Sequence, residues 1–306
     1  MREPALIRML PDGRRVHLQE GPIDLIIHAD GDVASTGHAY RGAAARFVTV
    51  LDELCAELPL LRGQAKPNGE RPNGAIARRM VAAVEPYGAR QFITPMAAVA
   101  GAVAEAVLSA MTRSGEVDRA YVNDGGDIAI HLSPGQRYRI GMIERPEKLS
   151  LFGAVEISSC SPVRGIATSG WRGRSFSLGI ADAVTVLAAS ASEADAAATI
   201  IANAVDLPDH PAILRVAACE IVPDSDLRDL LVTRDIGALS LSDIDKALEN
   251  GVRVAEDLRA RGLIHSAALC LRGHVRTVTG THGLERSFPQ DASIQIVSSP
   301  GSLPHA

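Results

Sequence analysis

The chain has 306 residues, of which 46% are hydrophobic, 22% are charged and 3% are aromatic, and its formal net charge is −5. This composition is typical of a globular protein with a substantial buried core. The negative charge and the scarcity of aromatic side chains argue against a nucleic-acid partner. A small anionic ligand held by a local cluster of residues is compatible with the composition.

Cysteine spacing and apolar patterning indicate the cellular compartment in which the protein is expected. The four cysteines, Cys55, Cys160, Cys219 and Cys270, form no CxxC pair, and so they predict neither a structural zinc site nor a redox motif. The opening residues lack the apolar segment of a secretory signal, and no stretch has the uninterrupted apolar length of a membrane span. We therefore expect a cytoplasmic protein without membrane association.

The first half of the chain predicts strands followed by helices. Two short strands flank the Pro-Asp-Gly turn at 11–13, and an apolar strand is expected at Ile23–His28. The loop RGQAKPNGERPNG at 62–74 is either a flexible lid or a simple connector. Apolar periodicity predicts helices at about Thr36–Leu58, Ala75–Val84 and Pro95–Arg113. The Ala/Gly content of the last of these helices lets another backbone approach it closely.

The second half predicts a meander, further strands and two helices. Two β-rich runs join at Asn123–Gly126, QRYRIGMI follows as a third strand of the meander, and HSAALCLRGHVRTVTG resembles a closing hairpin. One helix is expected at 189–205 and another at about Ser242–Arg261, with Ser242 and Asp245 in capping-box positions. Strands and helices alternate without repeated βαβ units, which predicts the α+β class. We expect one domain over 1–282 and a weakly ordered tail over 283–306.

The segment ASASEADAAATIIANAV, residues 189–205, places three oxygen-bearing side chains, Asp195, Thr199 and Asn203, on one face of a helix. A capping box that pairs Ser192 with Asp195 would explain the aspartate but not Thr199, which is a mediocre helix former. Alternatively, a carboxylate and a hydroxyl four residues apart can bind one hard cation such as Mg²⁺. Both interpretations stay open at this stage.

Two further segments have the composition of ligand-binding loops. In NDGGD, the residues Gly125, Gly126 and Asp127 either form a tight hairpin turn or admit a phosphate or ring close to the backbone. In ATSGWRGRSFS, hydroxyl groups, a glycine and arginines suit a phosphorylated ligand, although a polar surface loop has the same composition. Its residues of interest are Thr168, Ser169, Gly170, Arg172 and Arg174, with Trp171 either stacking on a ring or anchoring the loop.

Taken in order, these segments resemble the ApbE-like family, the FAD:protein FMN transferases. The family carries GGD, TSG and VTV motifs followed by a helix with D-x-x-x-T, and the corresponding positions are 125–127, 168–170, 184–186 and 195–199. The helix after Pro95 occupies the place of a small-residue helix that supplies a backbone carbonyl in the family. The resemblance covers roughly residues 90 to 205.

The resemblance implies an α+β fold whose mixed or antiparallel sheets and packed helices surround a ligand cleft for FAD or FMN. It also implies a magnesium ion on Asp195, Thr199 and a backbone carbonyl, and transfer of FMN to a hydroxyl of an acceptor protein with loss of AMP. Some relatives instead hydrolyse FAD to FMN and AMP. The residues that would contact the ligand are Gly125, Gly126, Asp127, Thr168, Ser169 and Gly170. Arg172 is a further candidate, as a charge partner, on its own chemistry rather than on the resemblance.

The chain also departs from the family pattern. Between TSG and VTV the family has H-x-x-D-P-x-T-G, whereas this chain has WRGRSFSLGIADA, without the histidine or the Asp-Pro pair. Three hypotheses therefore stay open. The first is a magnesium-dependent flavin or nucleotide-diphosphate protein that transfers FMN or cleaves FAD. The second is a non-catalytic flavin- or metabolite-binding protein on the same fold, and the third is an enzyme acting on a different phosphorylated substrate.

Overall fold

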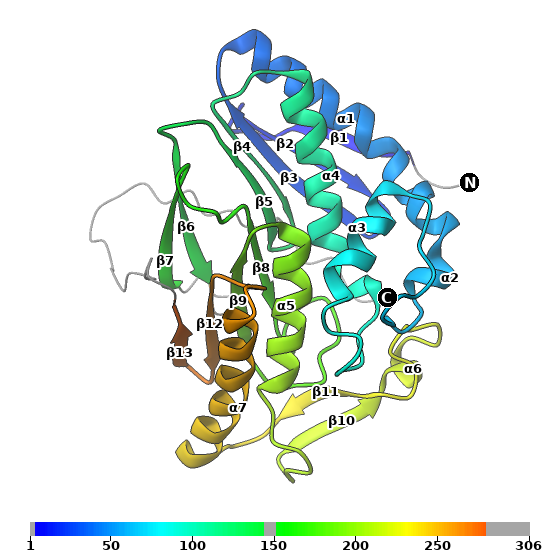
Figure 1. Cartoon of the computed structure of the whole chain (residues 1–306), viewed down its shortest axis with the longest axis vertical. Coiled ribbons are helices and arrows are strands. Elements are labelled where there is room, and N and C mark those ends of the chain that lie inside the picture. Colours follow the sequence, from blue (N-terminus) through cyan, green and yellow to red (C-terminus); the bar gives the residue numbers. More distant parts are fainter. Residues whose placement is uncertain (1–3, 144–150, 280–306) are drawn as a thin grey trace.

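The computed structural model describes residues 4–143 and 151–279, and one large antiparallel sheet organises them (Figure 1). Nine strands pair in the order β1-β2-β3-β4-β5-β8-β9-β12-β13, and each neighbouring pair runs antiparallel. The predicted α+β class is confirmed. The strands of this sheet are β1 (Leu6–Met9), β2 (Arg15–Glu20), β3 (Ile23–Asp30), β4 (Arg119–Asp124), β5 (Asp127–Leu132), β8 (Gly165–Ser169), β9 (Ala183–Ala188), β12 (Ser266–Leu271) and β13 (His274–Val278).

Two ribbons stand apart from the large sheet. β6 (Arg137–Ile143) pairs with β7 (Leu151–Ser158), and β10 (Ile213–Ala217) pairs with β11 (Leu231–Ile236). The prediction that QRYRIGMI extends the β4–β5 meander is therefore wrong. β8 occupies the edge of β5 that a third meander strand would need, through the pairs Ile128↔Ile166 and Ala129↔Gly165.

Four long helices cover one face of the sheet, and three of them, α1, α4 and α5, were predicted with boundaries shifted by a few residues (Figure 1). The fourth, α7, was predicted to within one residue at each end, but the predicted capping box is wrong, because it consists of Ser240 and Asp243 rather than Ser242 and Asp245. The helices are α1 (Val33–Ala56), α2 (Leu58–Leu61), α3 (Ala75–Val84), the 3-10 turn η1 (Pro95–Ala98), α4 (Val99–Ser114), α5 (Ala191–Ala204), α6 (Ala218–Ile221) and α7 (Leu241–Ala260).

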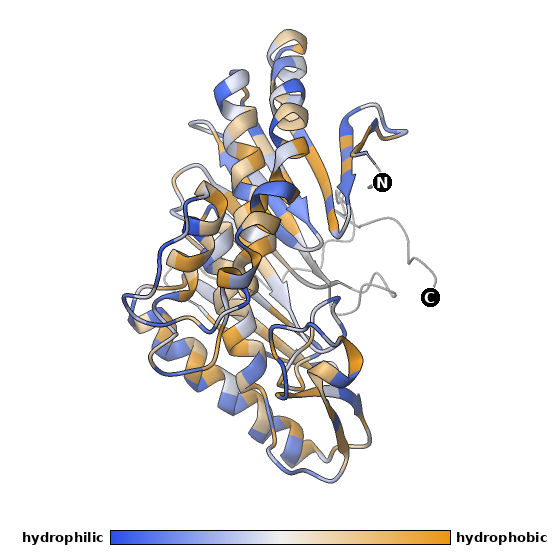
Figure 2. Cartoon of the chain, turned by 90° about the vertical axis from the view of Figure 1, so that its right-hand side faces the viewer, coloured by the Kyte–Doolittle hydropathy of each residue, from blue (hydrophilic) through white to orange (hydrophobic). Residues whose placement is uncertain are grey.

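The sheet separates two hydrophobic cores, because successive side chains of a strand point to opposite faces. On β3, Leu25 and Ile27 belong to the core beneath the helices, whereas Ile26 belongs to a second core on the other face. Tyr138 and Ile157 of the β6–β7 ribbon cover that second core. Figure 2 shows hydrophobic residues along the strands, while the helices alternate between hydrophobic and hydrophilic bands, as expected for amphipathic elements.

The stretch Pro95–Ser114, which comprises η1 and α4, is long and apolar enough to cross a membrane by length and composition. The sequence was not expected to contain such a stretch. However, 61% of its most apolar window is buried inside the protein, where α4 packs against α1, α5 and β4. This helix therefore has the surroundings of a core helix.

The loop at 62–74 is held to the body of the protein at both ends. Ala65 N donates a hydrogen bond of 2.8 Å to Ile93 O. The carboxylate of Glu57 accepts hydrogen bonds from the backbone nitrogens of Asn73 (2.7 Å) and Gly74 (2.6 Å). These contacts favour the connector over the lid. The tail predicted at 283–306 lies outside the described residues.

Candidate functional site

The GGD motif forms the turn between β4 and β5. Gly125 and Gly126 are the two turn residues, with φ values of +63° and +119° that favour glycine. Gly126 N donates a hydrogen bond of 2.9 Å to Asn123 Oδ1, which closes the turn. Asp127 begins β5, and its Oδ1 accepts a hydrogen bond of 3.2 Å from Thr168 N. The predicted hairpin is confirmed, and its aspartate is bound to the TSG motif.

The TSG motif lies at the end of β8, beside the VTV motif of β9. Thr168 and Ser169 are the last two residues of β8, and Thr168 Oγ1 lies 2.9 Å from Thr185 Oγ1 across the strand pair. A Cβ added at Gly170 would lie 2.5 Å from the carbonyl oxygen of Asp182, so only glycine fits there. The GGD, TSG and VTV motifs therefore occupy one continuous part of the sheet.

The N-terminus of α5 differs from the predicted capping box. The N-cap is Ser190, whose hydroxyl accepts a hydrogen bond of 3.4 Å from Glu193 N. Asp195 is the fifth residue of the helix and lies beyond the first turn, where a side chain no longer caps the free backbone N–H groups. The capping-box interpretation of Ser192 and Asp195 is therefore wrong, because the helix begins earlier than the sequence pattern suggested.

Asp195 and Thr199 lie one turn apart on the same face of α5, and both are half-buried. Asp195 Oδ2 accepts a hydrogen bond of 3.1 Å from Gly101 N at the start of α4. Asn203, further along this face, accepts a hydrogen bond of 2.9 Å from Leu178 N and so binds the segment that precedes β9. The helix therefore leaves Asp195 and Thr199 as its candidate ligand pair.

Close packing of α4 on α5 fixes the position of Asp195. A Cβ added at Gly101 would lie 2.6 Å from Ser192 N and nearer still to the carbonyl oxygen of Ala191, so the two backbones are in direct contact. Glu105 of α4 accepts two hydrogen bonds of 2.7 Å, from Ser192 N and Ser192 Oγ, and its other oxygen lies 2.6 Å from Arg79 Nε. The close approach predicted from the Ala/Gly content is confirmed.

Three carboxyl groups influence one another at this junction. Burial raises the pKa of Asp195 to about 8, and the charge of Asp124 adds to the increase. Burial also raises the pKa of Asp124 to about 7, against the opposing charge of Arg174. The pKa of Asp127 is raised well above its usual value by burial and then by the charges of Asp195 and Asp124. Such mutual repulsion would be relieved by a bound cation.

The donor atoms at the junction fit a hard cation. Carboxylate and hydroxyl oxygens are the ligands that Mg²⁺ prefers in proteins, and Mg²⁺ commonly completes its coordination with water and substrate phosphate. No group of three His, Cys, Asp or Glu side chains within residues 4–143 and 151–279 is arranged to hold a metal ion. A cation on Asp195 would therefore need the Thr199 hydroxyl, a backbone carbonyl or the ligand itself.

Arg172, which the sequence suggested as a charge partner for a ligand, is bound by the protein itself. Its Nε lies 2.8 Å from Asp182 Oδ1, and its guanidinium stacks 4.3 Å from the ring centroid of Trp171. Trp171 Nε1 donates to the same oxygen at 3.1 Å, and Arg272 N donates to the other at 2.6 Å. Trp171 therefore anchors the loop, which is one of its two predicted roles.

Arg174 and Asp124 form a pair at the GGD turn; the sequence suggested Arg174 only for its loop composition and did not single out Asp124. Arg174 Nη2 lies 3.4 Å from Asp124 Oδ1, and the guanidinium covers Gly125, where an added Cβ would clash with it. Asp124 precedes the GGD motif directly, so its position in the hairpin was the available signal. The pairing with Arg174 becomes visible only in three dimensions.

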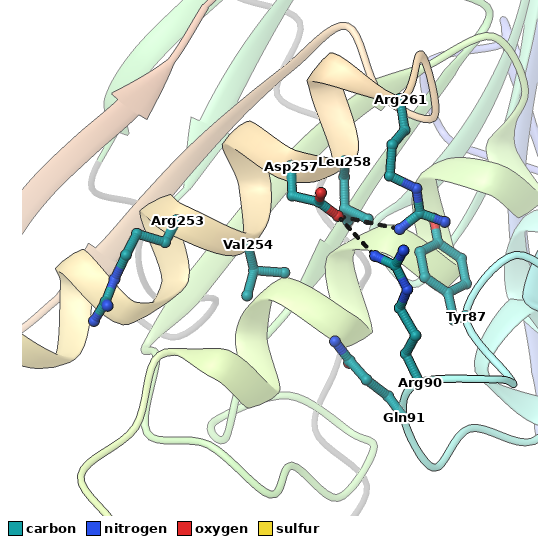
Figure 3. Close-up of a pocket in the computed structure, with 8 residues that line it drawn as sticks. All are labelled: Tyr87, Arg90, Gln91, Arg253, Val254, Asp257, Leu258 and Arg261. Atoms are coloured by element: carbon teal, nitrogen blue, oxygen red, sulfur yellow. Dashed lines mark hydrogen bonds and ion pairs between the residues drawn. The ribbon is translucent and has the colours of Figure 1, made fainter.

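A cavity of about 230 Å³ lies elsewhere, between the segment that follows α3 and the second half of α7 (Figure 3). Its lining contains no residue of the GGD or TSG motifs and neither Asp195 nor Thr199. The ligand cleft expected around the motifs therefore stays a prediction. The residues that line the cavity are Tyr87, Arg90, Gln91, Arg253, Val254, Asp257, Leu258 and Arg261.

Comparison with known proteins identifies the family. A family model described as "AbpE bacteria" matches residues 7–277. The chain belongs to this ApbE-like family. The match covers the GGD, TSG, VTV and D-x-x-x-T segments, and it extends well beyond the range of about 90 to 205 over which the sequence motifs alone indicated a resemblance.

Relatives of this ApbE-like chain include archaeal proteins named UPF0280. One from Methanothrix thermoacetophila is 32% identical over 227 residues, which are 70% of this chain and 86% of that protein. One from Methanosphaerula palustris is 36% identical over 156 residues, 51% of this chain and 63% of that protein. One from Methanospirillum hungatei is 37% identical over 142 residues, 46% of this chain and 55% of that protein. The chain thus spans between about half and two thirds of the length of the last two relatives.

Among solved structures, the ApbE-like chain is similar to the ApbE protein of Thermotoga maritima, with 12% identity and a TM-score of 0.47 over 89% of this chain and 96% of that one. A second similar structure is the flavinyl transferase ApbE of Pseudomonas stutzeri in its apo form. It has 12% identity and a TM-score of 0.43 over 92% of this chain and 95% of that one.

Proposed function

We propose that this protein binds a flavin nucleotide, FAD or FMN, or a related nucleotide diphosphate, together with a magnesium ion on Asp195 and Thr199. The observation that carries the proposal is the convergence of the motifs. Asp127 of GGD is hydrogen-bonded to Thr168 of TSG, and Asp195 is held by Gly101. Membership of the ApbE-like family supports the same assignment.

Each motif would have a separate task in this site. The Gly125–Gly126 turn exposes backbone to a ligand, and a hydroxyl such as that of Ser169 can donate a hydrogen bond to a phosphate oxygen. Asp195 and Thr199 would hold the cation, with a backbone carbonyl as a further ligand. Arg174 is exposed and can exchange its long contact with Asp124 for a ligand phosphate.

The reaction that we favour is transfer of FMN from FAD to a hydroxyl of an acceptor protein, with AMP as the leaving group. Hydrolysis of FAD to FMN and AMP would use the same site with water in place of the acceptor. A magnesium ion, when bound, would offset negative charge on the diphosphate. The chain's own contribution is to orient the diphosphate between the GGD turn and the end of β8.

A non-catalytic flavin- or metabolite-binding protein is the second candidate, and one observation favours it. Arg172, in the segment where the family has H-x-x-D-P-x-T-G, is bound to Asp182 and stacked on Trp171. That segment therefore performs a structural task here and contains no histidine. A third candidate is an enzyme that acts on a different phosphorylated substrate through the same cation site.

The decisive experiment is incubation of the purified protein with FAD and Mg²⁺, followed by chromatographic detection of FMN and AMP. The variants are Asp195→Ala and Thr199→Ala, and the matched control is Glu193→Ala, which removes a charge from the exposed side of the same helix. We expect magnesium-dependent AMP release that is lost in both site variants and retained in the control.

Other outcomes discriminate among the candidates. Tight flavin binding without AMP release would favour the binding protein. Magnesium-dependent binding of other phosphorylated compounds, with no preference for flavin, would favour the third candidate. If neither flavin nor magnesium binds, the proposed function is wrong.

A further inference from the structure

The cavity between the segment after α3 and α7 lies outside the motif site, and its lining is basic. Its lining contains three arginines, Arg90, Arg253 and Arg261, and one aspartate, Asp257, which leaves an excess of positive charge. Val254 and Leu258 of α7 add an apolar wall. A site with cationic groups and an apolar wall fits a small organic anion better than it fits water or an inorganic cation.

The two ends of the cavity differ. At one end, Arg90 and Arg261 converge on Asp257, with the ring of Tyr87 beside Arg261 (Figure 3). Arg253 lies at the other end, four residues before Asp257 on α7, which corresponds to about 6 Å along the helix axis. The cavity is therefore elongated along α7, and each end has at least one guanidinium; that of Arg253 donates to Asn250 Oδ1 and would exchange this contact for a ligand.

At this end the Arg90 guanidinium is available to a ligand, whereas Arg261 Nη2 already donates a hydrogen bond of 3.0 Å to Pro86 O. Asp257 Oδ2 lies 3.1 Å from Arg261 Nη1 but 3.8 Å from Arg90 Nη1, which is too long for a hydrogen bond. The Tyr87 side chain is almost fully buried, yet its hydroxyl makes no hydrogen bond to any residue in 4–143 or 151–279. Burial raises the pKa of Tyr87 above its usual value, so the hydroxyl keeps its proton and can donate.

We propose that this cavity is a second binding site, for a small phosphate monoester that carries another anionic group at its far end. The phosphate lies against Arg90, Arg261 and the Tyr87 hydroxyl, because a phosphate offers three acceptor oxygens to several donors at once. The carbon body lies against Val254, and the second anionic group approaches Arg253. Asp257 holds Arg261 in position.

The test uses isothermal titration calorimetry on the whole protein, without magnesium, with three probes. Inorganic phosphate tests the phosphate end alone. Glycerol 3-phosphate adds a neutral body, and 3-phosphoglycerate adds a carboxylate. We expect saturable binding of all three, with 3-phosphoglycerate the tightest.

The variants locate the two ends. Arg90→Ala should weaken every probe about tenfold to a hundredfold, since it removes charge-assisted hydrogen bonds to the phosphate. Tyr87→Phe should weaken every probe by a smaller factor. Arg253→Ala should weaken 3-phosphoglycerate and leave glycerol 3-phosphate unchanged. Arg259→Ala, which removes an exposed arginine from the same helix outside the cavity, should change nothing.

Several results would overturn the proposal. Absence of saturable binding at millimolar probe concentration would do so, and so would equal loss of affinity in Arg259→Ala and Arg90→Ala. Equal binding of sulfate and of all three probes would show only a general anion effect. Asp195→Ala should bind the probes as the unmodified protein does, so failure of the proposed flavin site and failure of this site are separate outcomes.

Discussion

Replacement of Gly101 by alanine tests whether the contact between α4 and α5 positions the Asp195 carboxylate. The added Cβ would lie 2.6 Å from Ser192 N and nearer still to Ala191 O, and neither backbone atom can rotate away. Carbon packs against other heavy atoms at about 3.5 Å, so the helices must separate by roughly 1 Å. Overpacking of this kind costs about 1–3 kcal/mol. The same separation would lengthen the 3.1 Å hydrogen bond from Gly101 N to Asp195 beyond a useful distance.

Urea unfolding followed by circular dichroism measures the first effect, and calorimetric titration with Mg²⁺ measures the second. We expect Gly101→Ala to lower the free energy of unfolding by about 2 kcal/mol and to weaken magnesium binding. The control is Gly37→Ala in α1, where the added Cβ would meet only the flexible tip of Arg41, at 3.4 Å. This control should be neutral or stabilising by up to about 1 kcal/mol. If both variants unfold at the same urea concentration, the inferred contact between α4 and α5 is wrong.

Three further predictions address other parts of the fold. In metal-free protein the raised pKa of Asp195 means that the folded state retains a proton that the unfolded state has lost, so the free energy of unfolding should fall as the pH rises from about 4 to about 8. Asp195→Asn should flatten this fall in urea titrations at several pH values. An unchanged slope would contradict the assignment. Asp182→Asn should lower the free energy of unfolding by about 2 kcal/mol, because it leaves the Arg172 guanidinium without its charge partner. The fluorescence of Trp171, the single tryptophan, should also shift. An unshifted spectrum would argue against the role of Trp171 as the anchor of the loop. Ser240→Ala should cost about 1 kcal/mol in thermal unfolding through loss of the capping box of α7, whereas Ser242→Ala, at the position first suggested by the sequence, should cost less.

Local pattern predicted most of the elements that carry the site. Glycine at positions 125 and 126 predicts a turn with positive φ, and the structure has that turn between β4 and β5. Apolar periodicity predicted the helices at 75–84 and 189–205 to within two residues. These features depend on neighbouring residues, which is why sequence alone suffices for them.

Features that depend on partners distant in the chain were not predictable in the same way. The separate β6–β7 ribbon exists because β8, after a long excursion of the chain, pairs with β5. Arg172 is bound to Asp182 through a contact that no local pattern encodes, whereas Arg174 approaches Asp124 across the sheet. The sequence assigned the charge role to Arg172, which the fold instead binds internally through Asp182.

The polarity of α5 is difficult to explain by packing alone. Ala194, Ala196, Ala197 and Ala198 are fully buried, so the helix sits close to the sheet and to α4. Asp195 lies among them with a carboxyl group whose pKa is raised to about 8, which means that burial penalises its charge. An apolar residue would avoid that penalty. A carboxyl group whose charged form is penalised by burial, and that is nevertheless oriented by a hydrogen bond from a neighbouring helix, is the arrangement expected where a bound cation would offset the charge.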